Sequence, residues 1–86
     1  MLDLAQHIEE TAFRLDGWET GTLVFDEPGV AFLMDPETRQ EKPVNIGSHV
    51  VEVETVQGWH RMKQSDYERI STDGTLLFAG ARCRMK

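Results

Sequence analysis

The chain has 86 residues and a formal net charge of −6 at pH 7, a length that allows one domain with a modest core. At 40% hydrophobic and 28% charged residues, the composition is typical of a globular domain and excludes a disordered chain. No apolar run is long enough to cross a bilayer, and no basic region followed by an apolar stretch marks a secretion signal. The single cysteine, Cys83, cannot form an intramolecular disulfide. These features predict one cytoplasmic domain over residues 1–86.

The charge is distributed unevenly along the chain. Residues 1–41 carry ten acidic and two basic residues, whereas residues 42–86 carry five acidic and seven basic residues. A solvated surface that keeps a small protein soluble accounts for this asymmetry. An acidic face that attracts a basic partner is the alternative interpretation.

Residues 2–15 have the apolar spacing of an amphipathic helix, and Asp16-Gly17 follows as a stop signal. A helix of this length is not stable alone in water. We therefore expect residues 1–16 to dock on the rest of the chain or on a partner. Its apolar stripe comprises Met1, Leu4, Ala5, Ile8, Ala12 and Leu15.

From Trp18 onward the sequence is typical of short strands and turns. The clearest stretch is 47–70, where Val51 and Val53 alternate with acidic residues before a turn and a second strand at Trp59. Five to seven antiparallel strands at this spacing predict a mainly β fold, specifically a small SH3-like barrel over residues 18–86. The other strand candidates are 20–25, 30–34, 67–70, 76–78 and 82–86.

A set of dispersed residues resembles a known family. The set comprises Gly21 to Glu27, Gly47 before a strand that contains glutamate, Trp59-x-Arg61, a strand beginning at Tyr67, Gly80 and Arg84. This pattern is similar to the domain of unknown function 5348 family, which consists of short bacterial proteins often encoded near mobile elements and phages. The resemblance covers about residues 20–86 and implies a compact β fold without an assigned activity. The chain has Asp66-Tyr67 where the family usually has a Trp-Tyr pair.

The residue types that carry most catalysis and metal binding are sparse. His7, His49, His60 and Cys83 show no spacing typical of a metal site, so we predict no metal and no cofactor. Cys83 alternates with Arg82 and Arg84, which places its thiol on the core side of a strand, where cysteine behaves as a small hydrophobe. We therefore predict that the protein is not an enzyme.

Basic and aromatic residues indicate a binding surface instead. Trp59, Arg61 and Lys63 alternate along one strand, and Arg82 and Arg84 share a face of the last strand. If these faces coincide, the result is a basic patch with an aromatic platform, as in barrels that bind single-stranded nucleic acid. The net charge of −6 and the pI of about 4.9 oppose that use. A protein partner is favoured, held in an aromatic groove, although Trp59 could instead belong to the core.

The sequence thus favours a small non-enzymatic protein-interaction or regulatory module of a bacterial or phage accessory system. One alternative is an acidic inhibitor that occupies the nucleic-acid-binding surface of its partner. The other is a weak binder of single-stranded nucleic acid. Both alternatives depend on charge, so both predict binding that falls steeply with salt.

Overall fold

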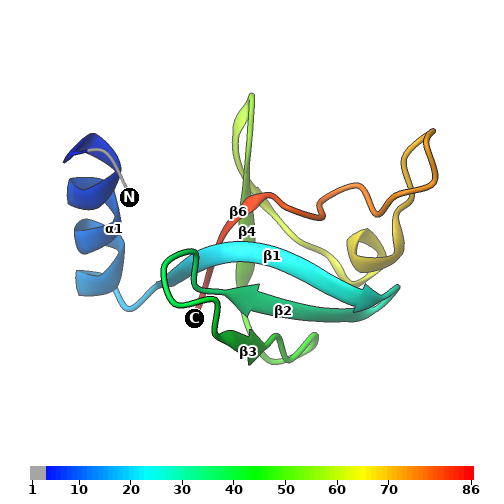
Figure 1. Cartoon of the computed structure of the whole chain (residues 1–86), viewed down its shortest axis with the longest axis horizontal. Helices are drawn as coiled ribbons and strands as arrows, with labels where there is room; N and C mark the ends of the chain where they lie inside the picture. The colour runs from blue at the N-terminus through cyan, green and yellow to red at the C-terminus, as the bar shows by residue number, and fades with distance from the viewer. Residues whose placement is uncertain (1–3) are drawn as a thin grey trace.

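The computed structural model describes residues 4–86, without the side chains of residues 4–7 and 10. Within this range the prediction of a mainly β fold is confirmed, because six antiparallel strands form one sheet (Figure 1). In chain order the elements are α1 (Leu4–Leu15), β1 (Glu19–Glu27), β2 (Val30–Met34), β3 (Glu41–Pro43), β4 (Val51–Thr55), β5 (Gly58–Arg61), the 3₁₀-helix η1 (Gln64–Glu68) and β6 (Arg82–Met85).

The last strand of the chain lies in the middle of the sheet. The strand order is β3-β2-β1-β6-β4-β5, so β6 pairs with β1 on one side and with β4 on the other. Cys83 lies opposite Gly21 of β1 and also opposite Val53 of β4. Figure 1 shows the red C-terminal strand running between the cyan and green strands. Within the sheet, the hairpins β1–β2 and β4–β5 are therefore joined through β6.

The sheet is open, with β3 and β5 at its two edges, so the predicted barrel is not confirmed. Two segments predicted as strands adopt other structures: Tyr67 belongs to η1, and only an isolated bridge joins Ile70 to Leu76. The Asp66 carboxylate accepts a hydrogen bond from the Lys63 backbone N–H at 2.8 Å. This side chain stabilises a helical turn and competes with strand pairing.

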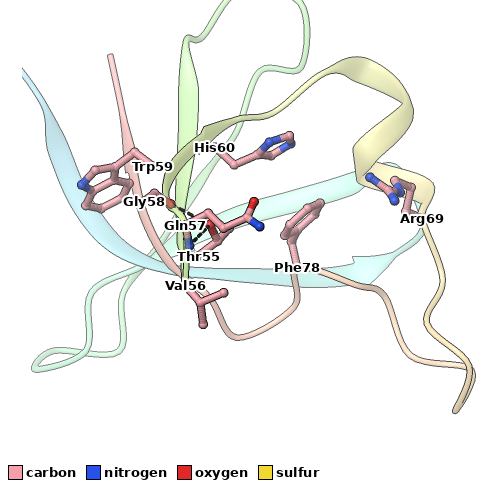
Figure 2. A pocket seen from close by; sticks show the side chains of 8 residues that line it. All are labelled: Thr55, Val56, Gln57, Gly58, Trp59, His60, Arg69 and Phe78. Atoms are coloured by element: carbon pink, nitrogen blue, oxygen red, sulfur yellow. Dashed lines mark hydrogen bonds between the residues drawn. The ribbon is translucent and has the colours of Figure 1, made fainter.

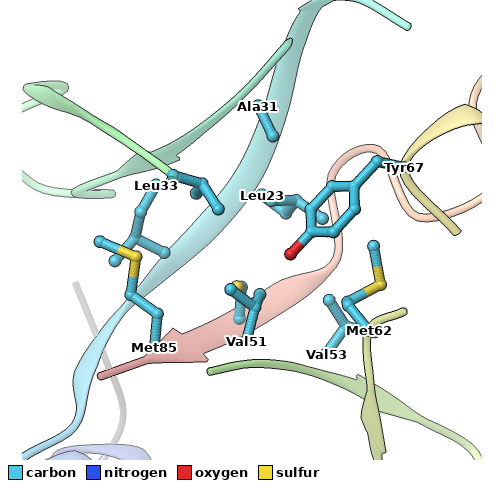
Figure 3. Packing of buried hydrophobic residues seen from close by; sticks show 10 residues of the cluster. Leu23, Ala31, Leu33, Val51, Val53, Met62, Tyr67 and Met85 are labelled. Carbon is cyan, nitrogen blue, oxygen red and sulfur yellow. The ribbon is translucent and has the colours of Figure 1, made fainter. Parts of the chain in front are cut away.

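The core lies between the inner face of the sheet and η1. Figure 3 shows Tyr67 of η1 among side chains from the strands, and burial raises the pKa of its phenol to about 12. Cys83 and Met85 point inward, as the alternation in the last strand predicts. The buried apolar residues are Leu23, Ala31, Leu33, Val44, Val51, Val53, Met62, Tyr67, Cys83 and Met85.

Helix α1 contacts the sheet through a side chain outside the predicted stripe. Phe13 packs edge-on against Trp59, with ring centroids 5.4 Å apart. Of the predicted stripe, Ile8, Ala12 and Leu15 are exposed, which is a correction to the sequence interpretation. Met1 and the side chains of Leu4 and Ala5 lie outside the described residues. Among the helices described, none is long and apolar enough to cross a membrane.

We predict that Met85→Ala lowers the free energy of unfolding by about 3 kcal/mol, because it leaves a cavity under the central strand. Urea denaturation measures this value. Val56→Ala, at the fully exposed tip of the β4–β5 hairpin, should change the free energy of unfolding by less than about 0.5 kcal/mol. Equal effects of the two substitutions would contradict the placement of β6.

Candidate interaction surface

The strand register brings the two sequence-predicted faces together on the outer side of the sheet. Trp59 lies opposite Glu54 and Arg61 lies opposite Glu52, and Glu52 in turn lies opposite Arg84 of β6. Because residues opposite each other in antiparallel strands share a face, the two rows of side chains cross β5, β4 and β6. The acidic strand β4 therefore separates the two basic strands.

Aromatic rings and arginines interleave on this outer face. The Arg84 guanidinium lies 4.2 Å from the Trp59 ring centroid, 4.5 Å from that of Trp18 and 4.7 Å from that of Phe13. Arg82 lies 5.6 Å from the Trp59 centroid and 5.7 Å from that of Phe13. These distances are within the range of cation–π attraction. We call these five residues the aromatic–arginine cluster.

Carboxylates neutralise both arginines of the cluster. Arg84 donates through Nε to Glu52 Oε1 at 2.8 Å and through Nη2 to the same oxygen. Arg82 Nη1 lies 3.0 Å from Glu54 Oε2 and 3.4 Å from Glu9 Oε1 of α1. Only 17% of the Arg82 side chain and 16% of the Arg84 side chain are exposed. Arg82 and Arg84 therefore stabilise the packing of α1 and Trp59 on the sheet and do not form an open basic patch.

Arg61 and Lys63 are arranged differently from the two arginines of β6. Both are exposed, and neither has an ion-pair or hydrogen-bond partner for its side chain in the part of the chain that the structure describes. Trp59 is half-buried, and its ring contacts Phe13, Arg82 and Arg84. Lys63 follows the end of β5 and immediately precedes η1. It is therefore adjacent to the β5 edge but is not part of the strand that contains Trp59 and Arg61.

An open groove of about 330 Å³ follows the β4–β5 hairpin. In Figure 2 Trp59 lies on one side of the hairpin, and His60, Phe78 and Arg69 lie on the other. The His60 ring stacks on Phe78 with centroids 5.3 Å apart. Sequence reasoning considered His60 only as a metal ligand or as a catalytic partner of Cys83. It missed Phe78 and Arg69, because the three residues meet through the loop that follows η1. The lining residues are Thr55, Val56, Gln57, Gly58, Trp59, His60, Arg69 and Phe78.

Asp66 contacts His60 and Arg69, two of the residues that line this groove, and only 5% of its side chain is exposed. His60 Nε2 lies 3.0 Å from Asp66 Oδ2, and Arg69 Nη1 lies 3.3 Å from Oδ1. Burial by itself would raise the pKa of Asp66. The hydrogen bonds from the Lys63 backbone, His60 and Arg69 outweigh burial and hold this pKa below its ordinary value of 3.8. The polar corner before Tyr67 is a sequence signal for this turn, but it does not reveal the burial of Asp66.

The groups considered for catalysis occupy positions with other roles. Cys83 is fully buried, and burial raises the pKa of its thiol to about 12. The predicted inward orientation of this residue is thus confirmed, and its thiol stays protonated at neutral pH. Across the described residues, no group of three or more His, Cys, Asp or Glu side chains could hold a metal ion.

Comparison with protein-family models, curated proteins and solved structures finds no match. The resemblance to the domain of unknown function 5348 family therefore stays a prediction, and so does the bacterial or phage context that it implies.

We expect Phe13→Ala to release α1 from the sheet, because a helix of this length is marginal without tertiary contacts. The loss of helical signal in far-ultraviolet circular dichroism and a shift in tryptophan fluorescence would report it. The stability cost should be about 2 kcal/mol, below that of a fully buried phenylalanine. Leu15→Ala, on the same helix but with Leu15 84% exposed, is the matched control. If both variants retain the wild-type spectra, Phe13 does not dock the helix.

The lowered pKa of Asp66 predicts an acid-sensitive contribution to stability. Because this pKa is lower in the folded state, the contribution is fully present above the ordinary value of 3.8 and is lost as the pH falls through the folded-state pKa. Asp66→Asn should lower the free energy of unfolding by about 1.5 kcal/mol at neutral pH and weaken its acid dependence. Denaturation at several pH values tests this. Asp26→Asn, which changes an exposed carboxyl near the end of β1, is the control and should change the free energy of unfolding at neutral pH by less than about 0.5 kcal/mol.

Proposed function

We propose that this protein is a small non-enzymatic interaction or regulatory module of a bacterial or phage accessory system. Its partner is a protein, which binds at the edge of the sheet formed by β5. The observation that supports this most strongly is an accessible tryptophan, Trp59, at the edge of the sheet beside Arg61 and Lys63, two exposed cations without partners among the described residues. An open groove adjoins them.

The chemistry of these residues fits an interface. Tryptophan and arginine contribute most to binding energy in protein interfaces when they are held in place before binding. Trp59 is already held by Phe13, Arg82 and Arg84, so little side-chain freedom remains to be lost on binding. In this proposal Arg82 and Arg84 hold the Trp59 ring in position, and Trp59, Arg61 and Lys63 contact the partner.

The distribution of charge disfavours the nucleic-acid alternative. The ion pairs of Arg82 and Arg84 with glutamates leave only a small positive surface, and the net charge of −6 opposes a polyanion. The acidic-inhibitor alternative draws support from the exposed carboxylates near the opposite edge of the sheet, among them Glu37 and Glu41. An SH3-like barrel and a cytoplasmic location remain part of this proposal.

Arg61→Glu should abolish partner capture or weaken it about tenfold, equivalent to about 1.4 kcal/mol, without loss of thermal stability. Substitution of Arg61 tests the surface more specifically than substitution of Trp59, because Trp59→Ala would also remove the ring against which α1 packs. The measurement compares proteins retained by immobilised wild-type and variant chains. Arg39→Glu, in the loop between β2 and β3 near the opposite edge of the sheet, is a matched charge reversal.

Proteins retained by the wild type and by Arg39→Glu, but lost with Arg61→Glu, would support the proposed surface. Stronger retention by Arg39→Glu than by the wild type would support the acidic half of the chain as the binding face, because this variant adds a carboxylate there. Retention by all three chains would contradict the proposal. Retardation of single-stranded DNA at physiological salt would replace it with the nucleic-acid alternative.

A further inference from the structure

Two residues of β5 have backbone N–H and C=O groups that are not paired with β4. Met62 N–H donates to Val51 C=O at 2.8 Å, which identifies this pair as a hydrogen-bonded pair of the β4–β5 ladder. Such pairs alternate with non-bonded pairs in antiparallel strands. The register then makes Val53–His60 a bonded pair, while Trp59 and Arg61 belong to non-bonded pairs. The N–H and C=O groups of Trp59 and Arg61 therefore point away from β4.

No strand of the described residues covers these groups, because β5 is an edge of the sheet. The free edge ends at Lys63, whose backbone N–H is held by Asp66. The opposite edge, β3, contains Pro43, which lacks a backbone donor. β5 is thus the edge better suited to accept another strand.

The side chains around this edge provide two separate contact surfaces. An extended segment paired with β5 would direct alternate side chains to opposite faces of the sheet. One set would meet Trp59 and Arg61 on the outer face. The other set would enter the groove of about 330 Å³ beside His60, Phe78 and Arg69. Figure 2 shows Trp59 on one side of the hairpin and His60, Phe78 and Arg69 on the other.

The net charge of −6 opposes a polyanion at long range, but salt screens that effect, and at contact distance the charges at this edge favour a short acidic segment. Arg61 and Lys63 are exposed, and Arg69 remains 55% exposed despite its contact with Asp66. Glu52 is engaged by Arg84, and Glu54 by Arg82. Carboxylates on an incoming segment would therefore meet cations that have capacity for further contacts, and charge complementarity selects the partner and its register.

Resting on the interaction proposed above, we propose that β5 recruits an extended acidic segment of a partner protein as an additional strand of the sheet. Main-chain hydrogen bonds to Trp59 and Arg61 supply affinity, and pockets on the two faces supply specificity, which is the logic of strand addition. Pairing with a second copy through β5 is disfavoured, because it would bring the cations of two identical edges together.

Amide hydrogen exchange tests the proposed mode directly. The probe is a capped synthetic peptide, Thr-Glu-Val-Glu-Val-Glu-Thr, added to the full chain until the nuclear magnetic resonance shifts no longer change. Binding should slow exchange of the Trp59 and Arg61 amides by about tenfold or more. The His60 amide, which already faces β4, should change little. The same peptide with glutamine in place of glutamate should bind at least about fivefold more weakly.

Two substitutions at one position separate the backbone contribution from the charge contribution. Arg61→Gln removes the cation but keeps the outward N–H, so it should erase most of the preference for glutamate over glutamine. Arg61→Pro removes the N–H as well, at an edge position where proline is tolerated, and should abolish binding of both peptides. Thermal unfolding verifies that both variants fold. If the proline variant does not fold, the exchange measurement on the wild type still tests whether the peptide pairs with β5.

The outcomes distinguish this inference from the function on which it rests. Glutamate-dependent binding without protection of the Trp59 and Arg61 amides would overturn strand addition and leave the proposed surface intact. Protection that is equal for both peptides would overturn the acidic preference. Absence of binding to either peptide would overturn the inference, while the capture experiment with Arg61→Glu judges the interaction separately. A peptide-independent dimer that protects the same amides would show that a second copy occupies the edge.

Discussion

The C-terminal strand β6 holds the two halves of the molecule together, because neither β1–β2–β3 nor β4–β5 pairs with the other directly. Its inward residues, Cys83 and Met85, are buried between both halves, and its backbone completes the ladders of β1 and β4. A small sheet with one free face has few apolar contacts to spare. Stability therefore depends on β6, the last of the six strands in chain order.

The outward residues of the same strand organise the surface. Arg82 and Arg84 are mostly buried, and buried charges are tolerated only when they are paired. Glu52 and Glu54 from β4 and Glu9 from α1 supply the pairs, and the flat guanidinium groups stack on the aromatic rings. The arrangement attaches α1 through Phe13 and orients Trp59. A cluster that first suggests a basic binding patch thus acts as support for the edge beside it.

The β5 edge of the sheet combines unpaired backbone groups with an adjacent groove. Backbone groups at Trp59 and Arg61 are unpaired by strand register, and an aromatic groove lies next to them. Proteins usually protect such an edge with short strands and charged side chains. β5 is short and carries Arg61, so it is protected against other copies of itself while remaining suited to a segment of opposite charge.

The alternation of apolar and polar residues along the strands made much of this fold predictable from the sequence. The inward orientation of Cys83 and Met85, the β4–β5 hairpin and the mainly β class follow from period-two patterns and from turn residues, which act locally. The shared face of Trp59 and Arg61 follows from the same periodicity.

Only the tertiary structure decided which strands are neighbours, because pairing between residues far apart in sequence leaves no local pattern. That pairing places β6 at the centre of the sheet and leaves β5 at its edge. It also neutralises Arg82 and Arg84 with acids some thirty positions away. Asp66 accepts a hydrogen bond that stabilises η1 where a strand was predicted. Phe13 packs α1 against Trp59, whereas Ile8, Ala12 and Leu15 of the predicted stripe are exposed.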